Sequence, residues 1–281
     1  LYAGWSLPQV HAELGLDLIG ANNVWAQARG KFPLLVKLID AAAPLSVQVH
    51  PDDAYALAHE GNELGKTEMW VVLHAQPGAE LILGVKTGTT PAAFRQAIEH
   101  NQMEAHLHRL PVQAGDHICV PAGTVHAIMG GLILAEIMQN SDATYRVYDW
   151  GRVGADGRPR PLHVDKALDV IDFGRVEPEI VPPTVLSDEA GLRRDLLCRN
   201  RYFTTERVTL AAGAELRGAR TGDSLEIWGA IEGQATVNEL ALDAVRFCLL
   251  PAALGQYVVT AKTAATLLRT YVEGAEGTQR K

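Results

Sequence analysis

Short alternating runs bounded by turn residues are the feature that most limits how this chain can fold. Residues 45–50 alternate apolar and polar side chains, the pattern of a half-buried strand. Pro51-Asp52-Asp53 ends this run, because proline cannot donate to a sheet and aspartate favours turns. Similar runs follow at Glu68–His74 and Leu81–Leu83, and Gly84 closes the last of them. Segments of this kind favour antiparallel sandwiches or small barrels.

The chain has 281 residues, room for about two modest domains. One helix interrupts the first β-rich block, because Thr90 suits an N-cap and Pro91 suits a first helical turn. Three prolines within residues 176–184 indicate a linker. We therefore expect a mainly β protein with two jelly-roll-like β domains. The predicted segments are a first domain at residues 1–175 with a small helical insertion around 90–108, a Pro-rich linker at 176–197, and a second β domain at 198–281.

Charge and composition exclude several classes of partner. The chain has 25 Lys+Arg against 33 Asp+Glu, a net charge of −8, and its basic residues are scattered, so nucleic acid is not an expected partner. Apolar runs such as Phe247–Leu254 are far shorter than the roughly 20 residues that cross a bilayer, so no membrane partner is expected. Three widely spaced cysteines do not indicate a disulfide framework, and no charged stretch followed by an apolar run opens the chain. We therefore expect a cytoplasmic protein.

A candidate metal site comes from four residues on separate predicted strands. Gln48 and His50 are two residues apart on one strand, so their side chains leave the same face. Glu68 opens the next strand, and His126 follows a tight Pro/Gly turn in the pattern Gly115-x5-Pro121-x-Gly123-x2-His126. This spacing resembles the second metal-binding signature of the cupin superfamily, and His50 with Glu68 resembles the first. Nitrogen and oxygen ligands that converge from several strands would form an open site for a divalent metal.

Five motifs, in order and at similar spacing, resemble type I mannose-6-phosphate isomerase in its short bacterial form. They are Phe32-Pro-Leu-Leu-Val-Lys37, Leu45-Ser-Val-Gln-Val-His-Pro-Asp-Asp53, Gly65-Lys-Thr-Glu-Met-Trp70, Pro121-Ala-Gly-Thr-Val-His-Ala127 and Ser141-Asp-Ala-Thr-Tyr-Arg-Val-Tyr-Asp149. The match is strong over roughly residues 30–170 and weak beyond. It implies a two-domain cupin fold and an aldose–ketose isomerase that interconverts mannose 6-phosphate and fructose 6-phosphate.

The resemblance also implies roles for individual residues. One zinc ion per chain would be held by Gln48, His50, Glu68 and His126, although this ligand set also suits manganese, iron or cobalt. The catalytic arginine would be Arg146, Ser46 and Lys66 would line the substrate pocket, and Glu136 would face the same cavity. Arginine suits an enediolate or phosphate oxygen because its charge is permanent and its donors form a fixed fork. Lys66 and Glu136 are both candidates for the proton-transfer base, and the sequence does not choose between them.

Two other functions stay open at this point. The chain could be a different cupin metalloenzyme, such as another sugar isomerase or a dioxygenase, or a cupin that binds a sugar phosphate without turnover. The second β-rich block has no histidine after residue 200, so we expect a structural or interface role there. His163 is expected to have a packing or hydrogen-bonding role. The family usually begins with an additional stretch that includes an Ile-Gly-Glu-x-Trp-Glu-like strand, which is not found before Phe32, so we expect that a natural N-terminal segment is missing from this sequence.

Overall fold

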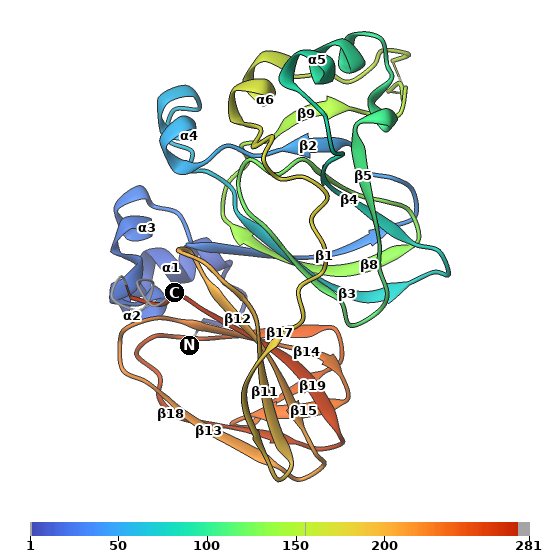
Figure 1. Cartoon of the computed structure of the whole chain (residues 1–281). Helices are drawn as coiled ribbons and strands as arrows, with labels where there is room; N and C mark the ends of the chain where they lie inside the picture. The colour runs from blue at the N-terminus through green and yellow to red at the C-terminus, as the bar shows by residue number, and fades with distance from the viewer. Residues whose placement is uncertain (1, 155, 275–281) are drawn as a thin grey trace. The chain divides into compact units, whose positions relative to one another are not determined.

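The computed structural model describes residues 2–154 and 156–274, which form two compact units (Figure 1). One unit runs from Leu34 to Val181, and the other combines the residues up to Pro33 with those from Pro182 onward. Each unit is built mainly from antiparallel strands, so the predicted mainly β fold is confirmed. None of the helices in the described ranges is long and apolar enough to cross a bilayer.

We call the unit at Leu34–Val181 the central unit, because it lies in the middle of the sequence. It is a sandwich of two sheets. The first sheet has the order β1-β8-β3-β6 and the second has the order β5-β4-β7-β2-β9. Inward-facing residues of both sheets, such as Trp70, Leu81 and Leu134, fill the space between them. The strands are β1 (Leu34–Ala41), β2 (Val47–Val49), β3 (Glu68–Ala75), β4 (Glu80–Val85), β5 (Leu107–Pro111), β6 (His117–Val120), β7 (His126–Ile128), β8 (Leu132–Gln139) and β9 (Tyr145–Tyr148).

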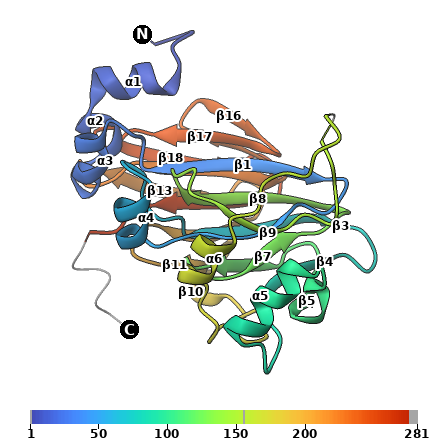
Figure 2. The same ribbon diagram turned by 90° about the horizontal axis from the view of Figure 1, so that it is seen from above.

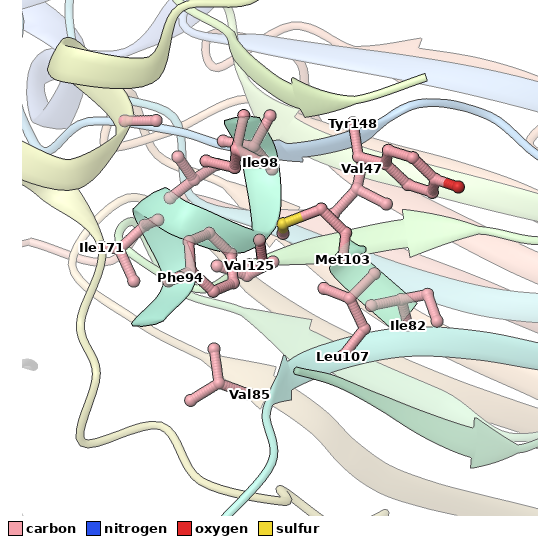
Figure 3. Close-up of a cluster of buried hydrophobic side chains, with 14 of the residues drawn as sticks. Val47, Ile82, Val85, Phe94, Ile98, Met103, Leu107, Val125, Tyr148 and Ile171 are labelled. Carbon is pink, nitrogen blue, oxygen red and sulfur yellow. The ribbon is translucent and has the colours of Figure 1, made fainter. Parts of the chain in front are cut away.

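Helices cover the outer face of the second sheet, as Figures 1 and 2 show. Phe94 and Ile98 of one helix pack in the same buried cluster as Val47 and Ile82 of the sheet (Figure 3). Because this face is apolar, the polar residues that alternate with Val47 and Val49 must point to the interior of the sandwich. The helices of this unit are α4 (Asp53–His59), α5 (Pro91–Glu99), η2 (Met103–Ala105) and α6 (Val164–Val170).

Local sequence explains the helix starts. Thr90 Oγ1 accepts a hydrogen bond from the Ala93 N–H at the start of α5, as the N-cap prediction requires, and α5 with η2 lies in the predicted insertion. Asp52 caps α4 in the same way by accepting from the Tyr55 N–H. From the sequence, Asp52 is predicted only as part of a turn, so α4 is not predicted.

The second unit combines the residues up to Pro33 with those from Pro182 onward. It is also a sandwich, with sheet orders β10-β11-β12-β19-β14-β17 and β13-β18-β15-β16. Its interior is apolar at the positions of Val208, Trp228 and Leu267. The strands are β10 (Thr184–Glu189), β11 (Leu192–Arg199), β12 (Thr204–Leu210), β13 (Glu215–Arg220), β14 (Glu226–Glu232), β15 (Gln234–Val237), β16 (Leu240–Asp243), β17 (Arg246–Leu250), β18 (Gly255–Ala261) and β19 (Ala265–Tyr271).

The division into units differs from the predicted domains at two places. Strands β10 and β11 occupy most of the predicted linker at residues 176–197, because the prolines end at Pro183 and a strand follows at once. The N-terminal helices belong to the second unit rather than to a first domain at residues 1–175, since Leu18 and Ile19 are buried against Leu225. These helices are α1 (Leu7–Leu14), α2 (Leu16–Ile19), η1 (Ala21–Asn23) and α3 (Val24–Arg29).

A buried ionic network lies among the inward-facing residues of the second unit. Glu206 and Glu226 are both fully buried, and Arg269 Nη2 is ion-paired with Glu226 while its Nη1 lies 3.6 Å from Glu206 Oε2. Tyr257 donates its hydroxyl to Glu226 Oε2 at 2.6 Å, and Arg194 donates two 2.9 Å hydrogen bonds to Glu206. The charges of these two buried carboxylates are thus neutralised by neighbouring arginines.

Cys248 is a free thiol, and burial raises its pKa to about 11. The described cysteines do not test the predicted reducing compartment, so a cytoplasmic location stays a prediction.

Candidate metal centre

Three of the predicted metal ligands form a compact buried group. His50, Glu68 and His126 each offer a ligand atom, and these atoms lie within 4.8 Å of one another. His50 Nε2 is 3.3 Å from Glu68 Oε1, and His126 Nε2 is 3.6 Å from Glu68 Oε2. All three side chains are at most 1% exposed. In the described ranges, this is the only group of three or more His, Cys, Asp or Glu residues with such a geometry.

Both imidazoles are oriented by backbone carbonyls. His50 Nδ1–H donates to the Ala143 carbonyl and His126 Nδ1–H donates to the Thr124 carbonyl, each at 2.9 Å. These hydrogen bonds place the proton on Nδ1 and leave the Nε2 lone pairs directed at Glu68. A metal-ligating histidine is normally held in this way by a second partner.

Several buried polar atoms at this centre have no hydrogen-bond partner among the described residues. They are His50 Nε2 and both carboxylate oxygens of Glu68. Lys66 Nζ lies 2.8 Å from Glu68 Oε1 as an ion pair, but without hydrogen-bond geometry. Because an unsatisfied buried carboxylate is costly, this donor set fits a divalent cation.

Burial and neighbouring charges favour the protonation states of Glu68 and His126 that metal binding requires. Burial alone would raise the pKa of Glu68, but His50, Lys66 and His126 outweigh it and hold that pKa well below its usual range. Burial, and next the neighbouring His50, lowers the pKa of His126 to about 3. The carboxylate is therefore ionised and His126 is neutral at neutral pH, as metal ligation requires.

Strand register explains how Gln48 and Arg146 join this group. In the second sheet, Gln48 on β2 is paired with His126 on β7 and with Arg146 on β9. Directly paired residues share a face of the sheet, so all three side chains leave the inner face in one row. Gln48 Nε2 lies 3.3 Å from His126 Nε2, and exchanging the amide oxygen and nitrogen would bring Oε1 to the same place.

Glu136 is connected to the centre through Trp70. The Trp70 indole N–H donates to Glu136 Oε1 at 3.2 Å, and the Trp70 ring is edge-on to His126 with centroids 5.3 Å apart. Lys37 Nζ lies 3.0 Å from Glu136 Oε2. No role is predicted for Lys37 from the sequence, although this residue ends the first of the five motifs and is paired with Glu136 in the β1–β8 register.

The remaining predicted residues lie at the ends of the same strands. Ser46 directly precedes β2 and is buried, two residues before Gln48. Arg146 is half-buried, and burial, followed by the nearby Arg160, lowers its pKa. Arg146 Nε is buried, and no described residue accepts a hydrogen bond from it. Arg160 itself is ion-paired with Asp149.

The fold and this centre define a cupin-type protein with a buried His–Glu–His metal site between its sheets. The family model of the phosphomannose isomerase type I catalytic domain matches residues 11–76. Mannose-6-phosphate isomerase of Streptococcus mutans is 41% identical over 217 residues, which cover 77% of this chain and 65% of that protein. The probable mannose-6-phosphate isomerase GmuF of Bacillus subtilis is 37% identical over 81% of this chain and 72% of its own length. The crystal structure of mannose 6-phosphate isomerase from Bacillus subtilis superposes with a TM-score of 0.77 at 30% identity and covers 89% of this chain and 81% of that one.

The chain therefore belongs to the mannose-6-phosphate isomerase family, the type I phosphomannose isomerases. It spans just under two thirds of the length of the Streptococcus mutans relative.

Proposed function

We propose that this chain is a metal-dependent aldose–ketose isomerase that interconverts mannose 6-phosphate and fructose 6-phosphate. The observation that carries the proposal is the buried His50–Glu68–His126 group, whose unsatisfied donor atoms share the sandwich interior with Arg146 in a member of this family. The proposed metal is one zinc ion, with Gln48 as the fourth ligand. When bound, such an ion stabilises negative charge on substrate oxygens as a Lewis acid.

Residues of this chain would stabilise the negative charge that develops on the substrate oxygen and transfer the proton between C1 and C2. Isomerisation moves a proton between C1 and C2 through an enediol or enediolate, so one group must take the proton and another must stabilise the oxygen. Arg146 keeps its charge and has an Nε–H donor without an acceptor among the described residues, which suits it to the enediolate or the phosphate. Ser46 and Lys66 would bind substrate from the edge of the metal centre.

Two groups are proposed for the proton transfer. Lys66 is nearly fully buried, with its Nζ 2.8 Å from Glu68 Oε1. Glu136 is buried and is held by the Trp70 indole N–H and by Lys37 Nζ, which lies 3.0 Å from Glu136 Oε2. The proposed compartment is the cytoplasm, because a charged sugar phosphate does not cross a membrane unaided.

Chelation tests the metal and the reaction together. We expect turnover of mannose 6-phosphate in a coupled assay to disappear with chelator and to return with added zinc, with one metal per chain by elemental analysis. Manganese, iron and cobalt, each added to the metal-free protein, would identify the most active ion. Full turnover without metal would contradict the proposed centre. One metal per chain without turnover would contradict the substrate and favour another cupin enzyme or a non-catalytic binder.

Replacing Arg146 tests isomerase chemistry separately from metal binding. We expect Arg146→Ala to lower kcat by about 10²–10³-fold, because an oriented donor to the developing charge is lost. Metal content should stay unchanged, since Arg146 contacts none of the three grouped ligands. Arg158→Ala, an exposed arginine in the following loop, is the matched control and should leave turnover intact. Unchanged kcat in Arg146→Ala would contradict the assignment of this arginine.

A further inference from the structure

The strand that carries Arg146 has an unpaired edge. In the second sheet of the central unit, β9 is the last strand, and within the described part of the chain it pairs only with β2. Backbone groups on its other side therefore need partners from outside the sheet. At a catalytic residue this matters, because a mobile edge strand cannot hold a side chain at a fixed position.

His163 provides hydrogen-bond partners for the backbone of Arg146. The Arg146 backbone N–H donates to His163 Nδ1 at 3.1 Å, and the His163 backbone N–H donates to the Arg146 carbonyl at 2.8 Å. Two residues earlier, the Pro161 carbonyl accepts a hydrogen bond from Arg146 Nη1 at 3.0 Å. One short segment thus holds Arg146 at both backbone groups and at its guanidinium.

The contact from the side chain works only with a neutral imidazole. An imidazolium has a proton on both nitrogens and cannot accept a hydrogen bond from the Arg146 N–H. The groups that face His163 are Tyr145 and Arg146 on β9, Lys166 on α6, and Glu60 at the end of α4. Burial, followed by Arg146 and Lys166, lowers the pKa of His163, so the imidazole is neutral at pH 7.

We infer that His163 is a positioning residue for Arg146, which fixes the arginine by accepting its backbone N–H through Nδ1. The inference rests on the proposed catalytic role of Arg146 and goes beyond it. It also gives a function to the hydrogen-bonding role that the sequence predicted for His163.

Two amide substitutions of His163 separate positioning from simple packing. The Oδ1 of His163→Asn can take the place of Nδ1 and accept the same hydrogen bond, whereas the longer side chain of His163→Gln puts its amide near the position of Nε2. We expect His163→Gln to lower kcat by roughly 10- to 100-fold, the scale of a small misplacement, with little change in KM. His163→Asn should stay within about threefold of the wild type. Equal losses in both variants, or no loss in either, would overturn the inference.

A pH profile of the wild type tests the same contact without depending on whether a variant folds. Protonation of His163 removes the acceptor, so kcat should fall as the pH drops through the lowered pKa of His163. His163→Asn should lack this acidic limb. Metal content is measured at each pH, so that loss of the metal at low pH is not mistaken for protonation of His163. Identical limbs in both proteins at constant metal content would contradict the role of His163.

A double variant separates failure of this inference from failure of the proposed function. If His163 acts through Arg146, then Arg146→Ala/His163→Gln should be no slower than Arg146→Ala alone. Loss of activity in Arg146→Ala with full activity in His163→Gln would overturn only the positioning role. Full activity in Arg146→Ala would overturn the catalytic role on which it rests.

Discussion

Glu68→Gln is expected to empty the metal centre and to abolish turnover. Glu68 supplies the only negative charge within the His50–Glu68–His126 group, and glutamine keeps its size but not its charge. We expect metal content to fall from one per chain to near zero and kcat to fall by more than the roughly 100-fold cost of losing an outer partner of a ligand. Stability should fall as well, because the buried Lys66 ammonium would lose its counter-charge.

Elemental analysis after dialysis, combined with the coupled assay, measures this effect. Glu80→Gln is the matched control, because Glu80 also opens a strand of the same unit but is partly exposed and ion-paired with Arg109. The control should keep both its metal and its turnover. Stoichiometric metal in Glu68→Gln would show that Glu68 is not a ligand.

Arg269→Ala is expected to cause the largest loss of stability in the second unit. The substitution removes the cation that Glu206 and Glu226 share, and leaves Arg194 to pair with Glu206 and Arg220 with Glu226. Removing one partner of a buried ion pair typically costs about 3–5 kcal/mol, much more than removing a surface pair. Urea unfolding at pH 7 measures the free energy of unfolding. The control is Arg217→Ala, which should change the free energy of unfolding little, because the Arg217 side chain is 75% exposed and paired with Glu215.

The loss of stability in Arg269→Ala should depend on pH. In the wild type, burial raises the pKa of Glu226, but the hydrogen bond and charge of Arg269, together with Tyr257 and Arg220, outweigh this and lower it. The stability from this pair is therefore present at neutral pH and is lost only as the pH falls through the lowered pKa. Without Arg269 the carboxylate pKa rises, so protonation at acidic pH relieves the buried charge. The difference in stability between the variant and the wild type should shrink as the pH falls, and a constant difference would contradict this account.

The sequence predicted the class of fold and the central part of the site because both depend on local patterns. Alternation at residues 45–50 predicts that Gln48 and His50 share one face of a strand, and the Pro/Gly turn precedes His126, which opens β7 in the structure and is paired with Gln48. The ion pair of Lys37 with Glu136 depends on the register of β1 and β8, which are about a hundred residues apart, and no local pattern encodes that register.

The elements that were missed have physical reasons too. Strand β10 is an edge strand with mostly exposed, mixed side chains, so it shows no alternation. The N-terminal helices are short, and their burial depends on contacts with distant residues such as Leu225. Propensity alone does not predict such segments, because tertiary packing supplies most of the stability of a short helix.

The register of β2 has a consequence for how a correctly folded molecule can be recognised. A slip of one residue would turn Val47 and Val49 towards the interior and send Gln48 and His50 into the apolar layer beneath the helices. Such a molecule could keep much of its secondary structure and still lack two of the four proposed ligands. Metal content after purification would therefore report whether β2 is in the correct register. It would distinguish misaligned chains from native ones even where their circular dichroism spectra agree.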